Sequence, residues 1–298
     1  MLPTNNVKDY GYISPRTFDR IANIIRHTLQ QNDFVWWQPS EPSILAACED
    51  PETLLSYTEN STGRKFPQDQ TKQMWLEYAI LSSIKERTAI SGLYCITESH
   101  RDEIHQAKRD PNRIINKRFN MFEFEMVGGF DPFLDVFTDV LLALGIKEDH
   151  IKRITYADAC ELLKQNRETY ILTDADEIWL NDTFAPCTLL THFPERTNPF
   201  WNMHMLPDGT AAKCDLILGG MECAGGAERS TNIQQQEYRF HSLPGYKQKL
   251  YNEFGQKRVL DELDFYFSLL TPLSIRSGCG IGLSRLAVAL ERYKKQTK

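Results

Sequence analysis

Residues 214–229 read CDLILGGMECAGGAER, a short apolar run framed by two acids and followed by a glycine-rich segment. Carboxylates such as Asp215 and Glu222, together with substrate phosphates, are the ligands that Mg²⁺ prefers. The glycines would let a ligand approach the backbone closely. The same sequence pattern could also come from a simple turn at 219–220 followed by a surface acid at Glu222. Arg229 is harder to explain in that way, because a bulky cation beside bare backbone usually faces an anion.

A second glycine pattern lies downstream, where residues 278–285 read GCGIGLSR and lead into an apolar helical pattern. Gly280 and Gly282 would clear room for a planar ligand, and Arg285 at the helix start can reach its phosphates, helped by the positive end of the helix. A single GxGxG pattern often occurs by chance and does not by itself indicate a nucleotide site. Its late position also does not suit a dinucleotide-binding fingerprint, which opens a βαβ unit.

A third pattern lies upstream, where residues 99–103 read SHRDE and Phe119 follows on the next strand-like run. The planar guanidinium of Arg101 suits a phosphate, and an aromatic face suits a purine. Taken alone, this pattern is better explained by a solvated surface pair of Arg101 and Glu103, with Phe119 in the core.

In this order, the three patterns resemble motifs two and three of class II aminoacyl-tRNA synthetases. Further segments resemble the asparaginyl members: ITY at 154–156, LTHFP at 190–194, PFW at 199–201 and QMWLE at 73–77. The likeness runs from about residue 14 to residue 298. It implies one α+β catalytic domain over residues 1–298, an antiparallel sheet flanked by helices, with residues 1–13 as an N-terminal extension.

The resemblance also implies roles for individual residues. For ATP, it implies that Arg101 binds the α-phosphate and that Glu103 binds the adenine amino group. Phe119 would stack on one face of the adenine, and Arg285 would contact the other face and the γ-phosphate. Gly280 and Gly282 would border the nucleotide. Arg101 and Arg285 would be the catalytic cations, and Asp215 and Glu222 would hold Mg²⁺. For the amino acid, it implies Glu49, Gln73 and Glu123 near the ammonium group and Gly226 and Arg229 near the side chain.

Departures from the family pattern shape the expected function. Aspartate-specific members carry a lysine three residues beyond the glutamine at Gln73, whereas Leu76 stands here, so the amino acid stays open. The basic residues of the 104–118 loop receive no individual roles. Ser277 and Cys279 also stand where the family has glycine or histidine.

The residues before Ser14 are too few for the anticodon-binding barrel of tRNA-charging relatives, which makes tRNA an unlikely partner. We therefore expect a ligase similar to ammonia-dependent asparagine synthetases. It would use ATP to convert aspartate, or a close analogue, into an acyl-adenylate and transfer it to ammonia or a small amine. Transfer to a tRNA, a carrier protein or a specialised metabolite is the alternative. A non-catalytic amino-acid or nucleotide sensor is the alternative of another class.

Periodicity predicts helices over 14–32, 70–85, 131–144, 156–165 and 283–294, strands over 33–37, 93–96, 119–127, 188–191, 200–206 and 214–218, and a turn-rich loop over 49–69. The strands at 93–96 and 119–127 should form a hairpin with a long charged loop. Glu123 and Glu125 alternate with apolar residues and should share one sheet face.

Composition limits the remaining possibilities. Of the 298 residues, 41% are apolar, which is enough for a buried core, and the net charge of −6 gives no general attraction to nucleic acid. The seven scattered cysteines contain no CxxC pair, and no apolar run approaches the ~20 residues of a membrane span. We expect a cytoplasmic protein without a membrane segment. The segment 18–39 resembles motif one, which predicts a homodimer.

Overall fold

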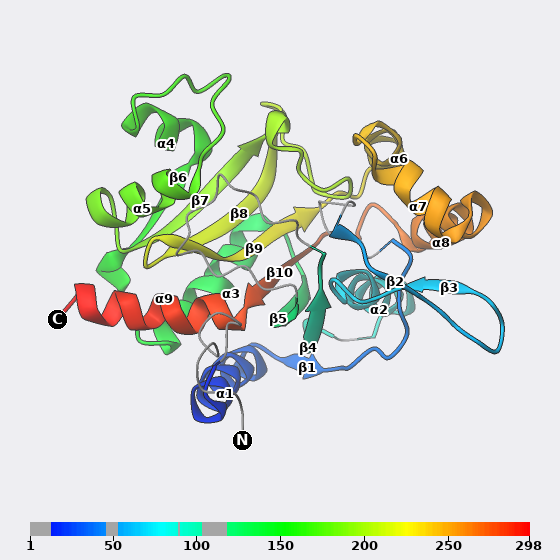
Figure 1. The fold of residues 1–298 in the computed structure, drawn as a ribbon, viewed down its shortest axis with the longest axis horizontal. Helices are drawn as coiled ribbons and strands as arrows, with labels where there is room; N and C mark the ends of the chain where they lie inside the picture. The colour runs from blue at the N-terminus through cyan, green and yellow to red at the C-terminus, as the bar shows by residue number, and fades with distance from the viewer. Residues whose placement is uncertain (1–12, 46–52, 89, 103–117) are drawn as a thin grey trace.

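The computed structural model describes residues 13–45, 53–88, 90–102 and 118–298 (Figure 1). Its centre is an eight-stranded sheet, with the strands in the order β1, β4, β5, β10, β9, β8, β7 and β6. Their bounds are β1 Phe34–Trp36, β4 Gly92–His100, β5 Arg118–Val127, β6 Ile151–Thr155, β7 Cys187–Pro194, β8 Thr210–Leu218, β9 Met221–Arg229 and β10 Arg276–Gly282. β1 runs parallel to β4 and β6 parallel to β7, whereas the other neighbours are antiparallel. The predicted α+β class is confirmed.

One face of the sheet packs on α1 (Pro15–Gln31), α3 (Phe130–Ala143) and α9 (Leu283–Gln296). The start of α1 follows from its sequence, because the Ser14 hydroxyl accepts the Thr17 N–H at 3.1 Å and Pro15 occupies the first turn. Ile25 of α1, Phe137 of α3 and Leu286 of α9 are buried together. Phe122 and Phe124 of β5 point into this same core.

Helices cover the other face at its two ends (Figure 1). At one end lie α2 (Gln73–Glu86), α6 (Ile233–Ser242), α7 (Tyr246–Phe254) and α8 (Gln256–Leu269), packed around the fully buried Trp201. At the other end lie α4 (Tyr156–Leu162) and α5 (Asp174–Thr183). None of the helices that the structure describes has the length and apolar character needed to cross a membrane.

Two expectations about the fold need correction. Part of the expected 49–69 loop is a small hairpin of β2 (Ser56–Thr58) and β3 (Lys65–Pro67). Residues 200–206 do not form a strand but a turn with two isolated bridges, Met203 to Arg229 and Met205 to Ala211. Phe200, Trp201 and Met203 are buried and anchor this turn in the core.

Candidate functional site

One face of the sheet brings together residues from distant parts of the sequence. Residues directly opposite each other on antiparallel strands share a face. The pairing therefore forms a row that consists of Glu123, Gly280, Gly225 and Asp215, from β5 across β10 and β9 to β8. The adjacent row consists of Glu125, Gly278, Ala227 and Lys213. Both predicted glutamates of β5 thus face the same side as Asp215.

The proposed nucleotide end of this face lies where β4 ends and β5 begins. Ser99 pairs with Phe119, so Arg101 follows directly beside the aromatic ring, with its Cζ 5.4 Å from the ring centroid. The Arg101 Nε is buried and makes no hydrogen bond within the described residues. An unpartnered guanidinium nitrogen over an aromatic face can bind a phosphate next to a stacked base. Glu103, expected to bind adenine, lies outside the described residues.

Asp215 and Glu222 face a common space because of the β8–β9 hairpin. Its turn places Gly219 and Gly220 at φ 57° and 73°, in the left-handed region that favours glycine. A Cβ built on Gly225 would lie 3.0 Å from Asp215 Oδ1 and 4.0 Å from Glu222 Oε1. The missing side chain of Gly225 therefore leaves the space between the two carboxylates open.

These two carboxylates fit Mg²⁺, a hard cation that takes oxygen ligands and usually binds through one or two carboxylates together with substrate phosphates. No group of three or more His, Cys, Asp or Glu side chains within the described part of the chain forms a larger metal site. Arg285, in the first turn of α9, places Nη1 4.0 Å from Glu222 Oε2. A phosphate bound to the metal would thus meet this arginine.

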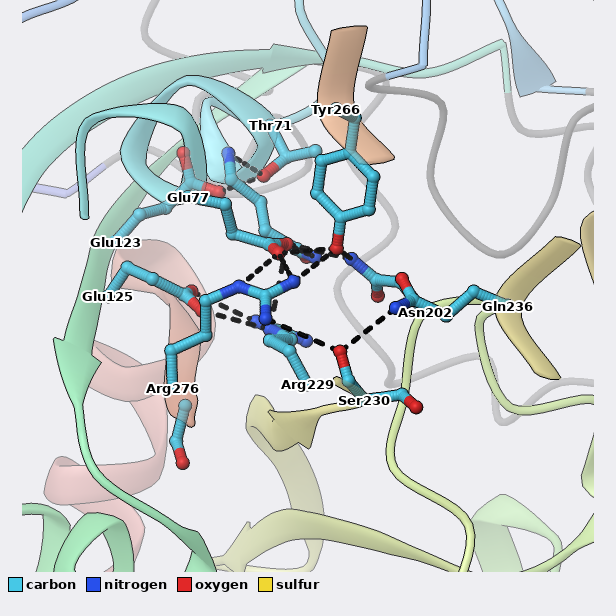
Figure 2. Close-up of polar contacts among 12 residues, drawn as sticks. Thr71, Glu77, Glu123, Glu125, Asn202, Arg229, Ser230, Gln236, Tyr266 and Arg276 are labelled. Atoms are coloured by element: carbon cyan, nitrogen blue, oxygen red, sulfur yellow. Dashed lines mark hydrogen bonds and ion pairs between the residues drawn. The ribbon is translucent and has the colours of Figure 1, made fainter. Parts of the chain in front are cut away.

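Arg229 lies at the other end of the site in a buried ion-pair network (Figure 2). Its Nε donates to Glu125 Oε1 at 3.1 Å and its Nη2 to Glu125 Oε2 at 3.2 Å. Glu77 lies on the other side, with Oε1 3.8 Å from the same Nε. The network fixes the direction of the Arg229 side chain and neutralises its charge.

Glu77 is the centre of the network. Arg276 donates through Nε to Glu77 Oε2 at 2.9 Å, and the Tyr266 hydroxyl donates to the same oxygen at 3.0 Å. The amides of Asn202 and Gln73 each donate to Oε1 at 2.8 Å. Burial alone would raise the pKa of Glu77, but Arg276 and Arg229 outweigh burial and hold that pKa below its ordinary value.

Glu125 is expected to make stability depend on pH. Burial raises its pKa from 4.5 to about 7, opposed by Arg229 and reinforced by Glu77. Between these values the folded protein keeps a proton that the unfolded chain has released. Protonated Glu125 therefore adds up to about 3 kcal/mol to the free energy of unfolding. This contribution is fully present below pH 4.5 and is lost as the pH rises through about 7. Urea unfolding from pH 5 to 8 should show this fall, and Glu125→Gln should flatten it. An equal slope in Glu125→Gln would contradict the assignment.

Glu123 has a different environment on the same face. Its carboxylate accepts from the Thr71 and Thr97 hydroxyls and, at 2.9 Å, from the Lys72 N–H. Burial raises the pKa of Glu123, although these hydrogen bonds oppose it. The residue thus fixes the start of α2, directly before Gln73. Glu49, which was expected to contact the ammonium group together with Gln73 and Glu123, lies outside the described residues.

Comparison with known proteins decides the family. A family model described as tRNA synthetases class II (D, K and N) matches residues 15–295. The chain belongs to this family.

Solved synthetase structures share its fold. The chain is similar to asparaginyl-tRNA synthetase from Pyrococcus horikoshii complexed with asparaginyl-adenylate, with a TM-score of 0.66 and 17% identity over 92% of this chain and 64% of that one. For the Entamoeba histolytica asparaginyl-tRNA synthetase with asparaginyl-adenylate, the TM-score is 0.65 with 20% identity over 92% and 63%. For aspartyl-tRNA synthetase from Entamoeba histolytica, the TM-score is 0.62, with 17% identity over 92% of this chain and 54% of that one.

The chain thus spans less than two thirds of the length of these synthetases. A search among curated protein sequences finds no significant match.

One predicted site residue of this class II chain, Gly226, has its side-chain position on the helix-covered face of the sheet. Gly226 pairs with Cys214 and Cys279 and lies on the opposite side of the sheet from Asp215 and Arg229. A Cβ on Gly226 would lie 2.4 Å from Phe133 Cζ, so this glycine permits packing against α3. The side-chain position of Gly226 is thus on the helix-covered face and that of Gly225 on the site face, and contact between Gly226 and the amino acid stays a prediction.

Gly226→Ala is expected to destabilise the fold by about 1–3 kcal/mol, because the new methyl group overlaps Phe133 and the Gly278 carbonyl oxygen. Urea denaturation measures the change. Gly282→Ala is the matched control, because its Cβ would come no closer than 3.5 Å to Cys223 O. Equal stability of the two variants would contradict the packing role.

Sequence reasoning missed most of the network around Arg229. Glu125 was placed on the correct face by its alternation with Phe124 and Met126, but it received no role. Glu77 was quoted only within a family-like segment. Arg276, Tyr266 and Asn202 carried no local signal, because Glu77, which all three contact, lies 125 to 199 residues away from them in the sequence.

Proposed function

We propose that the chain activates aspartate, or a close analogue, as an acyl-adenylate with ATP and Mg²⁺ and transfers the acyl group to ammonia or a small amine. The observation that carries this proposal is the arrangement on one sheet face. Arg101 and Phe119 lie at one end, Asp215 and Glu222 lie beside Arg285, and the buried Arg229 lies at the other end. Phosphate, base, metal and amino-acid groups each have a matching partner there.

In the first step, a substrate carboxylate oxygen attacks the α-phosphorus, and the bond from that phosphorus to the oxygen bridging to the β-phosphate breaks. Negative charge develops on the α-phosphate oxygens, which Arg101 stabilises through charge-assisted hydrogen bonds. Arg285 binds the leaving pyrophosphate. Mg²⁺, held by Asp215 and Glu222, supplies charge neutralisation when bound. In the second step, the amine attacks the acyl carbon and loses a proton, and AMP leaves.

The amino acid would lie between Arg229 and Glu123. Within the described residues, Arg229 makes its hydrogen bonds through Nε and Nη2. We propose that its Nη1 donates a hydrogen bond to an oxygen at the far end of the substrate side chain. Glu123, Gln73 and Glu49 would receive the ammonium group.

A second candidate function is activation of asparagine, with the acyl group passed to a tRNA, a carrier protein or a specialised metabolite. The observation that favours it is the likeness to two asparaginyl-tRNA synthetases in complex with asparaginyl-adenylate. A non-catalytic sensor of amino acid or nucleotide is the third candidate. It would keep binding without turnover.

The predicted homodimer and cytoplasmic location remain proposals. The edge strand β1 supports the dimer, since Val35 and Trp36 are 50% and 42% exposed. Exposed apolar side chains on an edge strand favour burial against a partner. Sedimentation would show a single-chain mass if this proposal is wrong.

The deciding experiment measures pyrophosphate and AMP release with ATP and Mg²⁺, with aspartate or asparagine, each with and without ammonium. Mass spectrometry identifies the product. Asparagine formed from aspartate and ammonium would establish the leading proposal. Pyrophosphate exchange without an amide product would favour another acceptor, and ATP binding without exchange would favour the sensor.

A further inference from the structure

Lys213 is a charged residue of the site face to which the sequence assigned no role. It lies on β8 two residues before Asp215, so both side chains are on the same side of the sheet. Its Nζ lies 3.4 Å from Asp215 Oδ2, and only 12% of each side chain is exposed. This is a shielded ion pair, formed at one of the two carboxylates that fit a divalent cation.

The Phe193 ring on the neighbouring strand β7 limits where this ammonium group can go. Lys213 Nζ lies 4.5 Å from the ring centroid. A cation over an aromatic face is attracted by the ring, and this attraction is stronger where water is partly excluded. The Lys213 charge is therefore held beside Asp215 and does not extend freely into solvent.

The two carboxylates lie between two cations. Lys213 lies beside Asp215, and Arg285 lies 4.0 Å from Glu222 on the other side. The charges of these four residues balance without a metal ion. A free divalent cation that entered between the carboxylates would be attracted by both of them but repelled by the fixed ammonium of Lys213.

We propose that Lys213 is a built-in counter-ion of Asp215 that opposes binding of free divalent cations, so that the metal enters together with the nucleotide. This inference rests on the proposed function, in which Asp215 and Glu222 hold the metal. The triphosphate is negatively charged, and it offsets the repulsion between Lys213 and the metal. The complex of metal and nucleotide therefore binds, whereas the bare ion binds weakly.

The size of the effect follows from Coulomb's law. Even with the screening of bulk water, a unit charge and a divalent ion about 5 Å apart repel enough to change an equilibrium constant by about tenfold. Partial burial of the Lys213–Asp215 pair lowers the screening. Removal of the Lys213 charge should therefore tighten binding of a free divalent ion by about tenfold or more.

The test compares binding of Mn²⁺ alone and of Mn²⁺ with ATP, by electron paramagnetic resonance and calorimetry, in the full chain. Lys213→Met removes the charge and keeps an apolar stem beside Phe193, whereas Lys213→Arg keeps the charge. Lys257→Met is the matched control, because Lys257 forms an exposed ion pair with Asp261 on α8. Thermal unfolding of each variant checks that the fold is retained.

The expected result is binding of free Mn²⁺ about tenfold tighter in Lys213→Met, with little change in Lys213→Arg and Lys257→Met. Binding of Mn²⁺ with ATP should change less than binding of the free ion. Equal affinity of Lys213→Met and the unmodified chain for free Mn²⁺ would overturn the inference. Failure of the unmodified chain to bind Mn²⁺ with ATP would instead overturn the proposed function, and the free-ion comparison would still report on Lys213.

Discussion

Arg276→Met is expected to lower the free energy of unfolding by about 3–5 kcal/mol, because it leaves Glu77 buried without its main cation. Arg276 Nη2 lies 2.7 Å from Glu77 Oε2, and both side chains are fully buried. Arg276 also donates to the Tyr266 hydroxyl and, at 3.0 Å, to the Ser274 carbonyl oxygen. Its loss therefore takes one donor from each of these buried acceptors.

Urea denaturation followed by circular dichroism measures this change. Arg167→Met is the control, since Arg167 forms only exposed ion pairs in the described structure and should change stability by less than about 1 kcal/mol. Replacing both partners, as Glu77→Leu with Arg276→Met, should recover part of the loss, because no isolated charge then remains. A loss below about 1 kcal/mol in Arg276→Met would mean that Glu77 does not depend on this arginine.

Arg101→Met is expected to lower the rate of amino-acid-dependent pyrophosphate exchange by about 10²–10³-fold, the usual cost of removing one group that stabilises transition-state charge. Arg101 follows the end of β4 and is only half-buried, so the fold should be retained. The effect should appear in the maximal rate more than in the affinity for the amino acid.

Exchange of labelled pyrophosphate into ATP measures this rate, and thermal unfolding checks the fold. Arg167→Met again serves as the control, since Arg167 is on a turn and its side chain forms exposed ion pairs with Glu161 and Glu168. Undiminished exchange in Arg101→Met would contradict the role of Arg101 at the α-phosphate, even if the chain proves to be an adenylating enzyme.

The sequence predicted those elements whose local pattern agrees with their environment. Ser14 and Pro15 marked the start of α1, and the alternation through β5 placed Glu123 and Glu125 on one face. The helices α6 to α8 were not predicted. In α8 the buried residues Val259, Leu263 and Tyr266 do follow a helical spacing, but polar residues between them obscure it.

The pairing of strands limited prediction of the site. Local sequence placed glycines at 225 and 226, but only the register with Asp215 shows that Gly225 faces the carboxylates and Gly226 faces Phe133. Similarly, nothing near Arg276 indicates that it contacts Glu77, which lies on α2, 199 residues earlier in the chain. Such long-range partners are determined by tertiary packing and not by periodicity.

The place of β10 in the sheet has a consequence for how the protein is made. This strand lies between β5 and β9 and joins β1, β4 and β5 to β9, β8, β7 and β6. During synthesis, the ribosome releases the other seven strands of this sheet before β10, so any partial sheet that forms in this interval would have an unpaired edge where β10 later pairs. Such edges attract other chains, so this interval is the one in which aggregation and chaperone binding should concentrate.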